Sequence, residues 1–585
     1  MDHLHKVDVV IVGGGWTGLL MANEITRRTP LSVLVLERGG PVRDYAAAMD
    51  ELDYSVRLRM MQNIADETVT HRHSGADRAV PVRQYGSFQP GTGVGGAGEH
   101  WGAHSKRYRV EAFKLATHLA ERFGRSNLPA DLAVQDWALT YDDLESYYWR
   151  AEQMMGVGGK AGNLRGRIIE GGDPFEGPRS DEYPNPPHGM SYFVSLFKKA
   201  AGDLGYHPFP MPTATLSQAY RNPEGVQRPG CMYCGYCARY GCMINAKAQP
   251  SNTLLPLLSN RRNFKLQTGA WVRRVEHRDG RAAGVRYVDD SGREKLQPAD
   301  VVVLSSWTAN NNRLLMMSRI GEQYDPATGK GTLGKNLTHQ LSQQLQLFFD
   351  KPLNAFMGAG SLGYAIGEFA GDPAGTQPSD AILRGAELRA VSGGLGPVES
   401  FGEVPAGEAG SDWGAGWKKS SIGWFDRVAH MTCEAAHLSY RQNYLDLDPT
   451  YTDKYGDPLL RMTLDWTPHE RRQKEFLAGK MLALGKATGA RVGRVAHSGA
   501  DEPRYSVTYY QGSHVQGGVI AGTSPEDSVV NTWLQHWHMP NVWVLGGATF
   551  PQNESANPTL TALATAYRSA DALIDRYLKK PAALA

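Results

Sequence analysis

Four of the five cysteines lie within twelve residues, and their spacing indicates bound iron rather than disulfide bonds. Cys231, Cys234, Cys237 and Cys242 follow the pattern C-x2-C-x2-C-x4-C, which is close to the ferredoxin run C-x2-C-x2-C-x3-C-P. Structural zinc usually draws two separated pairs of ligands across a longer loop. The cluster therefore predicts an iron–sulfur centre, with zinc and inert thiols as the alternatives.

A glycine turn near the N-terminus has the features of a dinucleotide-binding site. Gly13, Gly15 and Gly18 form a G-x-G-x-x-G turn after the β-branched run Val7–Val12, and Glu37 ends the next predicted strand. Such glycines let the backbone approach a pyrophosphate at a helix N-terminus, and an acid about twenty residues later binds a ribose. The alternative is a plain glycine-rich turn between a strand and a helix.

A second glycine cluster, at residues 91–98, has the same close-approach character and is followed by Glu99, His100 and Trp101. We expect Gly95 and Gly96 in this cluster to cradle the rest of the dinucleotide.

These motifs need an α/β framework to position them. The pattern predicts a Rossmann-like domain, with a helix over Tyr141–Met155 in an inserted segment and short strands such as His437–Asn443 in an antiparallel substrate domain. The predicted ranges are 1–110, 220–340 and 505–585 for the discontinuous dinucleotide-binding domain, 111–219 for a cap or insertion, and 341–504 for the substrate domain.

Composition excludes some partners. The chain has 585 residues, 62 Lys+Arg and 60 Asp+Glu, so its net charge of +2 carries no electrostatic footprint for nucleic acid. The longest apolar run near the start is too short for a membrane helix, and no signal peptide is evident. Taken alone, the chain would be cytoplasmic.

Together these motifs resemble the GMC (glucose-methanol-choline) flavin oxidoreductases along the whole chain. The resemblance rests on five segments: Val9–Gly18, Leu36–Gly39, Gly93–Trp101, Ser513-His514 and Asn557-Pro558-Thr559. Within the family, Gly159–Gly166, Asn185–Pro187 and Cys231–Cys242 are most similar to the large FAD subunit of bacterial gluconate 2-dehydrogenase-type complexes.

The resemblance implies catalysis by His514 and Asn557. Oxidising an alcohol by hydride transfer to flavin requires a base for the hydroxyl proton and a donor for the developing alkoxide. His514 is expected to be the base, since a neutral imidazole titrates near working pH, and Asn557 the partner of the substrate hydroxyl. The alternatives are a buried structural histidine and a turn residue before Pro558.

The resemblance also implies FAD as cofactor. Arg38, Val272, Gly547 and Asn557 are expected to contact it besides the two glycine clusters and Glu37. His100 occupies the segment where some relatives join a histidine to the flavin 8α-methyl group, so it is expected either to form that bond or to pack beside the ring.

For the cysteines, relatives imply a three-iron (3Fe-4S) cluster on Cys231, Cys237 and Cys242. Cys234 is then a spare, or the fourth ligand of a 4Fe-4S cluster. A cluster implies single-electron transfer to a cytochrome c or a quinone. The expected partners are a small signal-bearing subunit and a multiheme cytochrome c, with membrane contact through these partners and co-export to the periplasmic side of the inner membrane.

The substrate is expected to be a sugar, polyol or sugar acid, with gluconate as the best guess. Lys106 or Arg107 would hold a substrate carboxylate if their segment lines the pocket, or else be ordinary surface charges. Two alternatives remain for function: an oxidase resembling pyranose oxidase that uses oxygen, and a non-catalytic flavoprotein scaffold.

Overall fold

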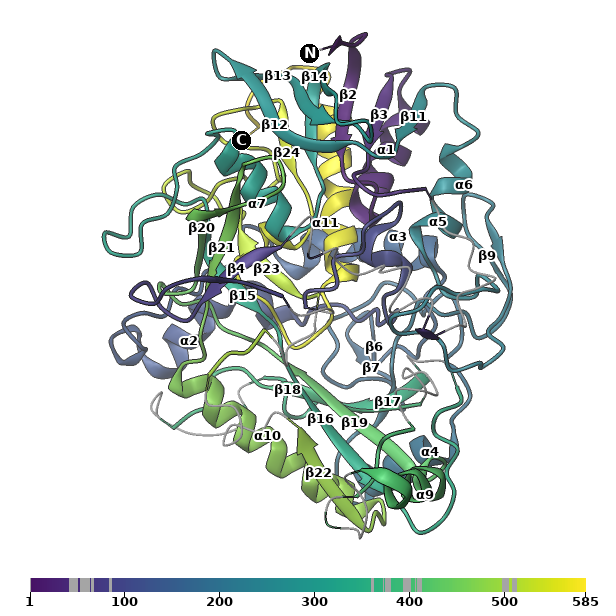
Figure 1. The fold of residues 1–585 in the computed structure, drawn as a ribbon. Helices are drawn as coiled ribbons and strands as arrows, with labels where there is room; N and C mark the ends of the chain where they lie inside the picture. Colours follow the sequence, from purple (N-terminus) through teal and green to yellow (C-terminus); the bar gives the residue numbers. More distant parts are fainter. Residues whose placement is uncertain are drawn as a thin grey trace.

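The computed structural model describes residues 2–41, 51–52, 64, 68–83, 87–358, 362–371, 373, 380–392, 401–405, 407, 413–496, 504–507 and 513–584. A mainly parallel sheet lies at one end of the molecule and an antiparallel sheet at the other, with the long helix α11 running from the first toward the second (Figure 1). Within the described residues, no helix is both long and apolar enough to cross a membrane.

The first sheet has the strand order β11-β3-β2-β14-β13-β12, with β1 and β24 also paired to β14. Pairing is parallel among β11, β3, β2, β14 and β24, and antiparallel from β14 through β13 to β12. The strands are β1 (Asp2–His3), β2 (Val7–Val12), β3 (Val33–Leu36), β11 (Phe264–Gln267), β12 (Trp271–Arg278), β13 (Arg281–Val288), β14 (Glu294–Leu304) and β24 (Val542–Val544).

The central strands are apolar because helices cover the sheet. β3 consists of Val and Leu alone and is buried throughout, as expected for a parallel strand covered on both faces. Helix α1 (Trp16–Arg28) packs against β3, and α11 (Thr559–Ala572) packs against both α1 and α3 (Tyr141–Met155). Most residues of α11 are buried, which makes it a core helix.

The second sheet is antiparallel, in the order β22-β16-β19-β18-β17-β8. Helices α10 (Pro468–Ala487) and α4 (Tyr192–Asp203) pack against it. Its strands are β8 (Phe209–Pro210), β16 (Leu341–Phe348), β17 (Leu362–Ile366), β18 (Ala386–Ser392), β19 (Val428–Ala435) and β22 (Val492–Ala496). This mixed α/β architecture agrees with the predicted fold class.

The other sheets of the described residues are small. The strands of these sheets are β4 (Val69–Arg72), β5 (Val80–Pro81), β20 (Tyr444–Thr452) and β21 (Pro458–Thr463); β15 (Lys335–His339) with β23 (Val515–Gly518); β6 (Asn163–Leu164) with β7 (Arg167–Ile168); and β9 (Tyr220–Arg221) with β10 (Gln227–Arg228). The remaining α-helices are α2 (Leu115–Phe123), α5 (Pro250–Thr253), α6 (Leu255–Leu258), α7 (Thr308–Met317) and α9 (Gly414–Trp424).

The predicted strand at His437–Asn443 is wrong: β19 ends at Ala435, and the residues after it are irregular. The His437 N–H donates to Asn553 Oδ1 rather than to a neighbouring strand. The Ser439 hydroxyl donates to the carbonyl of Pro551. Side-chain bonds thus replace a strand ladder and tie this segment to the loop before α11.

Candidate active site

The glycine turn after β2 runs so close to β14 that side chains are excluded. Gly13 has a φ of +104°, and a Cβ there would lie 2.4 Å from the carbonyl oxygen of Ser305. A Cβ on Gly18 would lie 2.2 Å from the Gly13 oxygen. Gly15 instead lines a cavity, and a Cβ there would meet only Gly95 O, at an ordinary contact distance of 3.8 Å. Gly13 and Gly18 therefore serve close packing, and Gly15 leaves room for a ligand.

Glu37 closes the end of β3 against the same turn. Its carboxylate accepts hydrogen bonds from the backbone N–H groups of Gly14 (2.9 Å) and Gly39 (2.8 Å). The neighbouring Arg38 guanidinium lies 5.1 Å from the centroid of the Trp271 ring. Glu37 and Arg38 both line the cavity, beside the glycine turn where a ribose would be bound.

The second glycine cluster joins the first through backbone contacts. The Gly95 N–H donates to Gly14 O at 2.8 Å, and both Gly95 and Gly96 have positive φ. The carboxylate of Glu99, at the end of this turn, accepts from the Ser251 N–H (3.0 Å) and hydroxyl (2.7 Å). Glu99 is a buried anchor that sequence reasoning missed, although an acid directly after a glycine loop could have signalled it.

A cavity of about 260 Å³ extends from these two turns to His514. The predicted site residues that line it are Gly13, Gly15, Glu37, Arg38, Gly95, Gly96, Val272, His514 and Gly547. Gly18, His100 and Asn557 lie outside its lining. These residues come from six separate parts of the chain, which meet around one elongated space.

Unpaired polar groups show that this space suits a polar ligand such as FAD. The indole N–H groups of Trp16 and Trp307, two residues of the cavity wall, are buried and have no hydrogen-bond partner among the described residues. Buried donors without a partner are costly, so a ligand that accepts from them is expected. Together with the open glycine cradle, this is what a dinucleotide cofactor requires.

His100 is buried behind the second glycine turn. Its Nε2 lies 3.2 Å from Gln89 O, while its Nδ1 has no hydrogen-bond partner among the described residues. Burial lowers the pKa of His100 to about 4, and the charges of Lys247 and Arg239 act in the same direction. The ring is therefore neutral and, with its proton on Nε2, has a free lone pair on Nδ1.

His514 and Asn557 meet at the far end of the cavity. His514 immediately precedes β23, Asn557 precedes α11, and their Nε2 and Nδ2 atoms are 3.4 Å apart. Burial lowers the pKa of His514; the negative charge of Glu434 opposes this and the positive charge of Arg389 adds to it. The neutral imidazole that a general base requires is thus the stable form near neutral pH.

Two charged residues of the second sheet flank this pair, and sequence reasoning missed them. Arg389 on β18 donates from Nη1 to Asn557 Oδ1 at 2.9 Å. The same nitrogen lies 3.2 Å from Glu434 Oε2 on the adjacent strand β19. Charged residues inside otherwise apolar strands are the signal that could have found them, because buried charges usually have a specific role.

The four clustered cysteines are free thiols on an irregular loop. Cys231 packs against Cys237, and burial raises the pKa of the Cys231 thiol to about 11. Backbone N–H groups donate to Cys231 Sγ (3.3 Å) and Cys242 Sγ (3.5 Å). Among the described residues, however, no three His, Cys, Asp or Glu side chains converge on a point that could hold a metal ion.

Lys247 fastens this cysteine loop to the loop that carries His100. The fully buried Nζ of Lys247 donates to the carbonyl oxygens of Trp101 (2.8 Å), Cys237 (2.8 Å) and Tyr240 (2.6 Å). The backbone N–H of Arg239 also donates to His100 O. The cysteine loop therefore lies directly against the predicted flavin loop.

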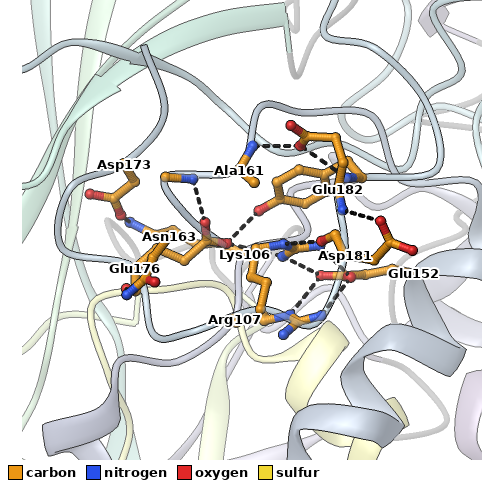
Figure 2. A network of polar contacts seen from close by, with 12 residues as sticks. Lys106, Arg107, Glu152, Ala161, Asn163, Asp173, Glu176, Asp181 and Glu182 are labelled. Atoms are coloured by element: carbon orange, nitrogen blue, oxygen red, sulfur yellow. Dashed lines mark hydrogen bonds and ion pairs between the residues drawn. The ribbon is translucent and has the colours of Figure 1, made fainter. Parts of the chain in front are cut away.

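Lys106 and Arg107 have other partners than a substrate. The guanidinium of Arg107 is buried and donates to Glu152 at 2.9 and 2.8 Å, and Lys106 Nζ lies 2.6 Å from Asp173 Oδ2. Figure 2 shows both inside a network of acids from the inserted segment. Neither lines the cavity, and the reading of Arg107 as a carboxylate-binding or surface charge is wrong because Glu152 already neutralises it.

The arrangement of a dinucleotide cradle that leads to a histidine–asparagine pair agrees with the comparisons with known proteins. Models of the GMC oxidoreductase family match residues 214–342 and 439–566. The gluconate 2-dehydrogenase flavoprotein of Pantoea cypripedii is 39% identical over 100% of this chain and 96% of its own length. This chain is a GMC oxidoreductase. GMC oxidoreductases bind FAD, and this one is an enzyme that acts on CH–OH donors.

More distant relatives of this GMC oxidoreductase agree on family and fold. The fructose dehydrogenase large subunit of Gluconobacter japonicus is 26% identical over 97% of this chain and 98% of its own length. A formate oxidase variant from Aspergillus oryzae superposes with a TM-score of 0.62 at 14% identity, covering 99% of each chain. Pyridoxine 4-oxidase from Mesorbium loti superposes with a TM-score of 0.58 at 16% identity, covering 97% of this chain and 98% of its own. At 14% and 16% sequence identity, the two solved structures support the fold only.

Proposed function

We propose that the chain is a dehydrogenase of a sugar, polyol or sugar acid, with gluconate as the first candidate. The observation that carries the proposal is the contact between His514 and Asn557 at the end of the cofactor cavity. The similarity to a gluconate 2-dehydrogenase flavoprotein over the whole chain supports the substrate class.

In this proposal His514 and Asn557 act on the same substrate hydroxyl, one as base and the other as hydrogen-bond donor. Their nitrogens are 3.4 Å apart, so one hydroxyl oxygen can reach both. The Nε2 lone pair of His514 takes the hydroxyl proton, and the Asn557 amide N–H donates to the oxygen as its charge develops. Bound FAD supplies the acceptor for the hydride that leaves the carbon. The proton remains on His514 until it passes to water.

FAD is proposed to lie along the cavity. Gly13, Gly15, Glu37 and Arg38 would hold its nucleotide end, and Gly95, Gly96, Val272 and Gly547 would contact it further along. His100, whose Nδ1 has no hydrogen-bond partner among the described residues, is the residue that would hold the flavin covalently. Retention of the yellow chromophore on the chain after acid precipitation would support the bond, and its release would leave His100 beside the ring without one.

The cysteine loop is proposed to be the route by which electrons leave. Its place against the loop of His100 and the N–H groups directed at two sulfurs support an iron–sulfur centre. Cys231, Cys237 and Cys242 are the proposed ligands of a three-iron cluster, with Cys234 as the fourth if four irons are present. Among the described residues the four sulfurs do not converge on one point, so the loop would have to rearrange to hold a cluster.

A surface for an electron acceptor is proposed at the same loop. The exposed side chains of Met232, Tyr233, Met243 and Met357 surround it, and Tyr233 O accepts from the Gly358 N–H. The proposed partners are a multiheme cytochrome c and a small subunit whose signal would carry the complex to the periplasmic side of the membrane. A cytoplasmic enzyme is the alternative.

Two measurements on the purified holoprotein test this function. Anaerobic addition of D-gluconate is expected to bleach the flavin absorbance, and iron analysis with low-temperature electron paramagnetic resonance is expected to find the cluster. Bleaching without iron, with hydrogen peroxide formed in air, would overturn the electron route and favour a sugar oxidase. No bleaching by gluconate, glucose or fructose would contradict the proposed substrate class.

A further inference from the structure

Arg389, Glu434, His514 and Asn557 form a closed ring of contacts. Arg389 Nη1 contacts both Asn557 Oδ1 (2.9 Å) and Glu434 Oε2 (3.2 Å). Glu434 Oε2 lies 3.9 Å from His514 Nδ1, and His514 Nε2 lies 3.4 Å from Asn557 Nδ2. The ring draws on β18, β19, the start of β23 and the loop before α11.

The donor and acceptor chemistry of the ring has one consistent assignment. A guanidinium can only donate, so the Asn557 atom that faces Arg389 is its oxygen, and the amide N–H₂ faces His514. An amide N–H₂ can only donate as well, so the facing Nε2 of neutral His514 presents its lone pair. The imidazole proton is then on Nδ1, on the side of Glu434.

The Glu434 carboxylate is placed to stabilise the positive charge of a protonated His514. Its Oε2 is buried and makes no hydrogen bond within the described residues, although it is ion-paired with Arg389. Burial opposes ionisation of this carboxyl, but Arg389, His514 and His104 hold the pKa of Glu434 below its usual value. A carboxylate with an open acceptor therefore faces His514 Nδ1.

Other charges around the ring alternate in sign. Arg389 lies 4.0 Å from Glu387, which pairs with Lys106, and Lys106 pairs in turn with Asp173. The other titratable groups near the ring are His104, Cys433 and Tyr108. Burial lowers the pKa of His104 to about 4 and raises the pKa of Cys433 and of Tyr108, so all three stay neutral near neutral pH. Of the charges that act on His514, Glu434 favours a positive imidazolium and Arg389 opposes it.

We propose that the Arg389–Glu434 pair is the positioning device of the active site. It fixes the amide of Asn557 with its N–H₂ toward the substrate, selects the His514 tautomer with a free Nε2, and stabilises the imidazolium formed when His514 takes the proton. Neither residue touches the substrate in this account. The inference rests on the proposed role of His514 as base.

The test is a double-mutant cycle on the holoenzyme, read by stopped-flow flavin reduction with D-gluconate. Glu434→Gln keeps the shape but removes the charge. It is expected to slow reduction by at least roughly 10-fold and by less than the roughly 10⁴-fold seen when a hydrogen-bonded orienting carboxylate is replaced, because Glu434 Oε2 lies 3.9 Å from His514 Nδ1. The acid limb of the pH profile should move to lower pH, because the charge that raises the His514 pKa is gone. The apparent Kd for gluconate should stay within about twofold, since the pair acts on the chemical step.

Glu403→Gln is the matched control. Oε1 of Glu403 lies 2.9 Å from Nε2 of His430, a residue of β19, the strand that also carries Glu434. Glu403 lies outside the cavity. Its substitution should therefore change neither the rate of flavin reduction nor its pH profile. In a His514→Ala background, Glu434→Gln is expected to have no further effect. Equal slowing in both backgrounds, or no slowing in the wild type, would overturn the positioning role.

A His514→Ala variant that reduces flavin as fast as the wild type would instead overturn the proposed function itself. If Glu434→Gln does not fold, the double variant Arg389→Met/Glu434→Gln removes both charges and leaves none unpaired. It is expected to slow reduction at least as much as Glu434→Gln, because it also removes the donor that fixes the Asn557 amide, and a wild-type rate in that variant would equally contradict the proposal.

Discussion

The two ends of the cavity are built in different ways. The nucleotide end consists of short contiguous segments, in which backbone N–H groups and glycines such as Gly13 and Gly95 form the wall. The catalytic end consists of single side chains from four distant segments, held by charge: Arg389, Glu434, His514 and Asn557. Substitutions should therefore act through steric exclusion at the first end and through electrostatics at the second.

The largest effect is expected at the glycine turn. Gly18→Val places a Cβ 2.2 Å from Gly13 O, so the turn must open and FAD binding should weaken by at least roughly 100-fold, given the backbone approach that a pyrophosphate needs. Gly40→Val is the control, because a Cβ there meets nothing within 4 Å. The ratio of flavin to protein absorbance measures both. Full flavin occupancy in Gly18→Val would show that close packing of this turn is not required.

The next effect is expected at Asn557. Asn557→Ala removes the proposed donor to the alkoxide and should lower the rate of flavin reduction by roughly 100-fold, as loss of one such donor typically does. FAD content should be unchanged, because Asn557 lies outside the cavity lining. Asn557→Asp tests the orientation of the amide, since a carboxylate would face His514 without a donor. A rate in either variant close to that of the wild type would contradict the assigned role.

A smaller effect is expected on the pH dependence of the rate of flavin reduction. Burial lowers the pKa of His514 below its ordinary value, against the opposing charge of Glu434. A base works when deprotonated, so the rate of flavin reduction should be level above about pH 7 and should fall, on acidification, only below the unperturbed pKa near 6.5. A stopped-flow profile with gluconate measures this. An acid limb centred above 6.5 would mean that the imidazolium, and not the neutral ring, is the stable form.

The smallest effect on catalysis is expected in the network of Figure 2. Arg179→Met leaves Glu152 paired with Arg107 alone, and removing one partner of a buried ion pair costs about 3 to 5 kcal/mol of stability. The rate of flavin reduction per folded molecule should be unchanged, because this network lies away from the cavity. Lys199→Ala, which breaks an exposed pair with Asp203, should cost at most about 1 kcal/mol. Denaturant titrations measure both.

Local patterns predicted elements of both the nucleotide end and the inserted segment. The strand Val7–Val12 and the helix Tyr141–Met155 have the bounds that the sequence predicts, because each shows a regular apolar pattern with clear end signals. The helix begins with a capping box at Thr140 and ends at Gly156 in the left-handed region. Such signals lie within a few residues of one another in the chain.

The catalytic end could be predicted only in part. His514 and Asn557 were found through a family motif, whereas Arg389 and Glu434 belong to no motif and meet only through the register of β18 and β19. The error at Lys106 and Arg107 has the same origin, because Glu152 and Asp173 come from the inserted segment and Glu387, the other partner of Lys106, comes from β18, all more than thirty residues away. Long-range pairing of charges is not visible in local spacing.

The most direct test of the account is anaerobic flavin reduction by D-gluconate in wild type and His514→Ala, with His207→Ala as the control at an exposed histidine. The account predicts bleaching in the wild type and the control, and a rate lower by roughly 100- to 10,000-fold in His514→Ala, the range for loss of a general base. Equal rates in all three proteins would contradict the assignment of His514 as the base that this cavity presents to the substrate.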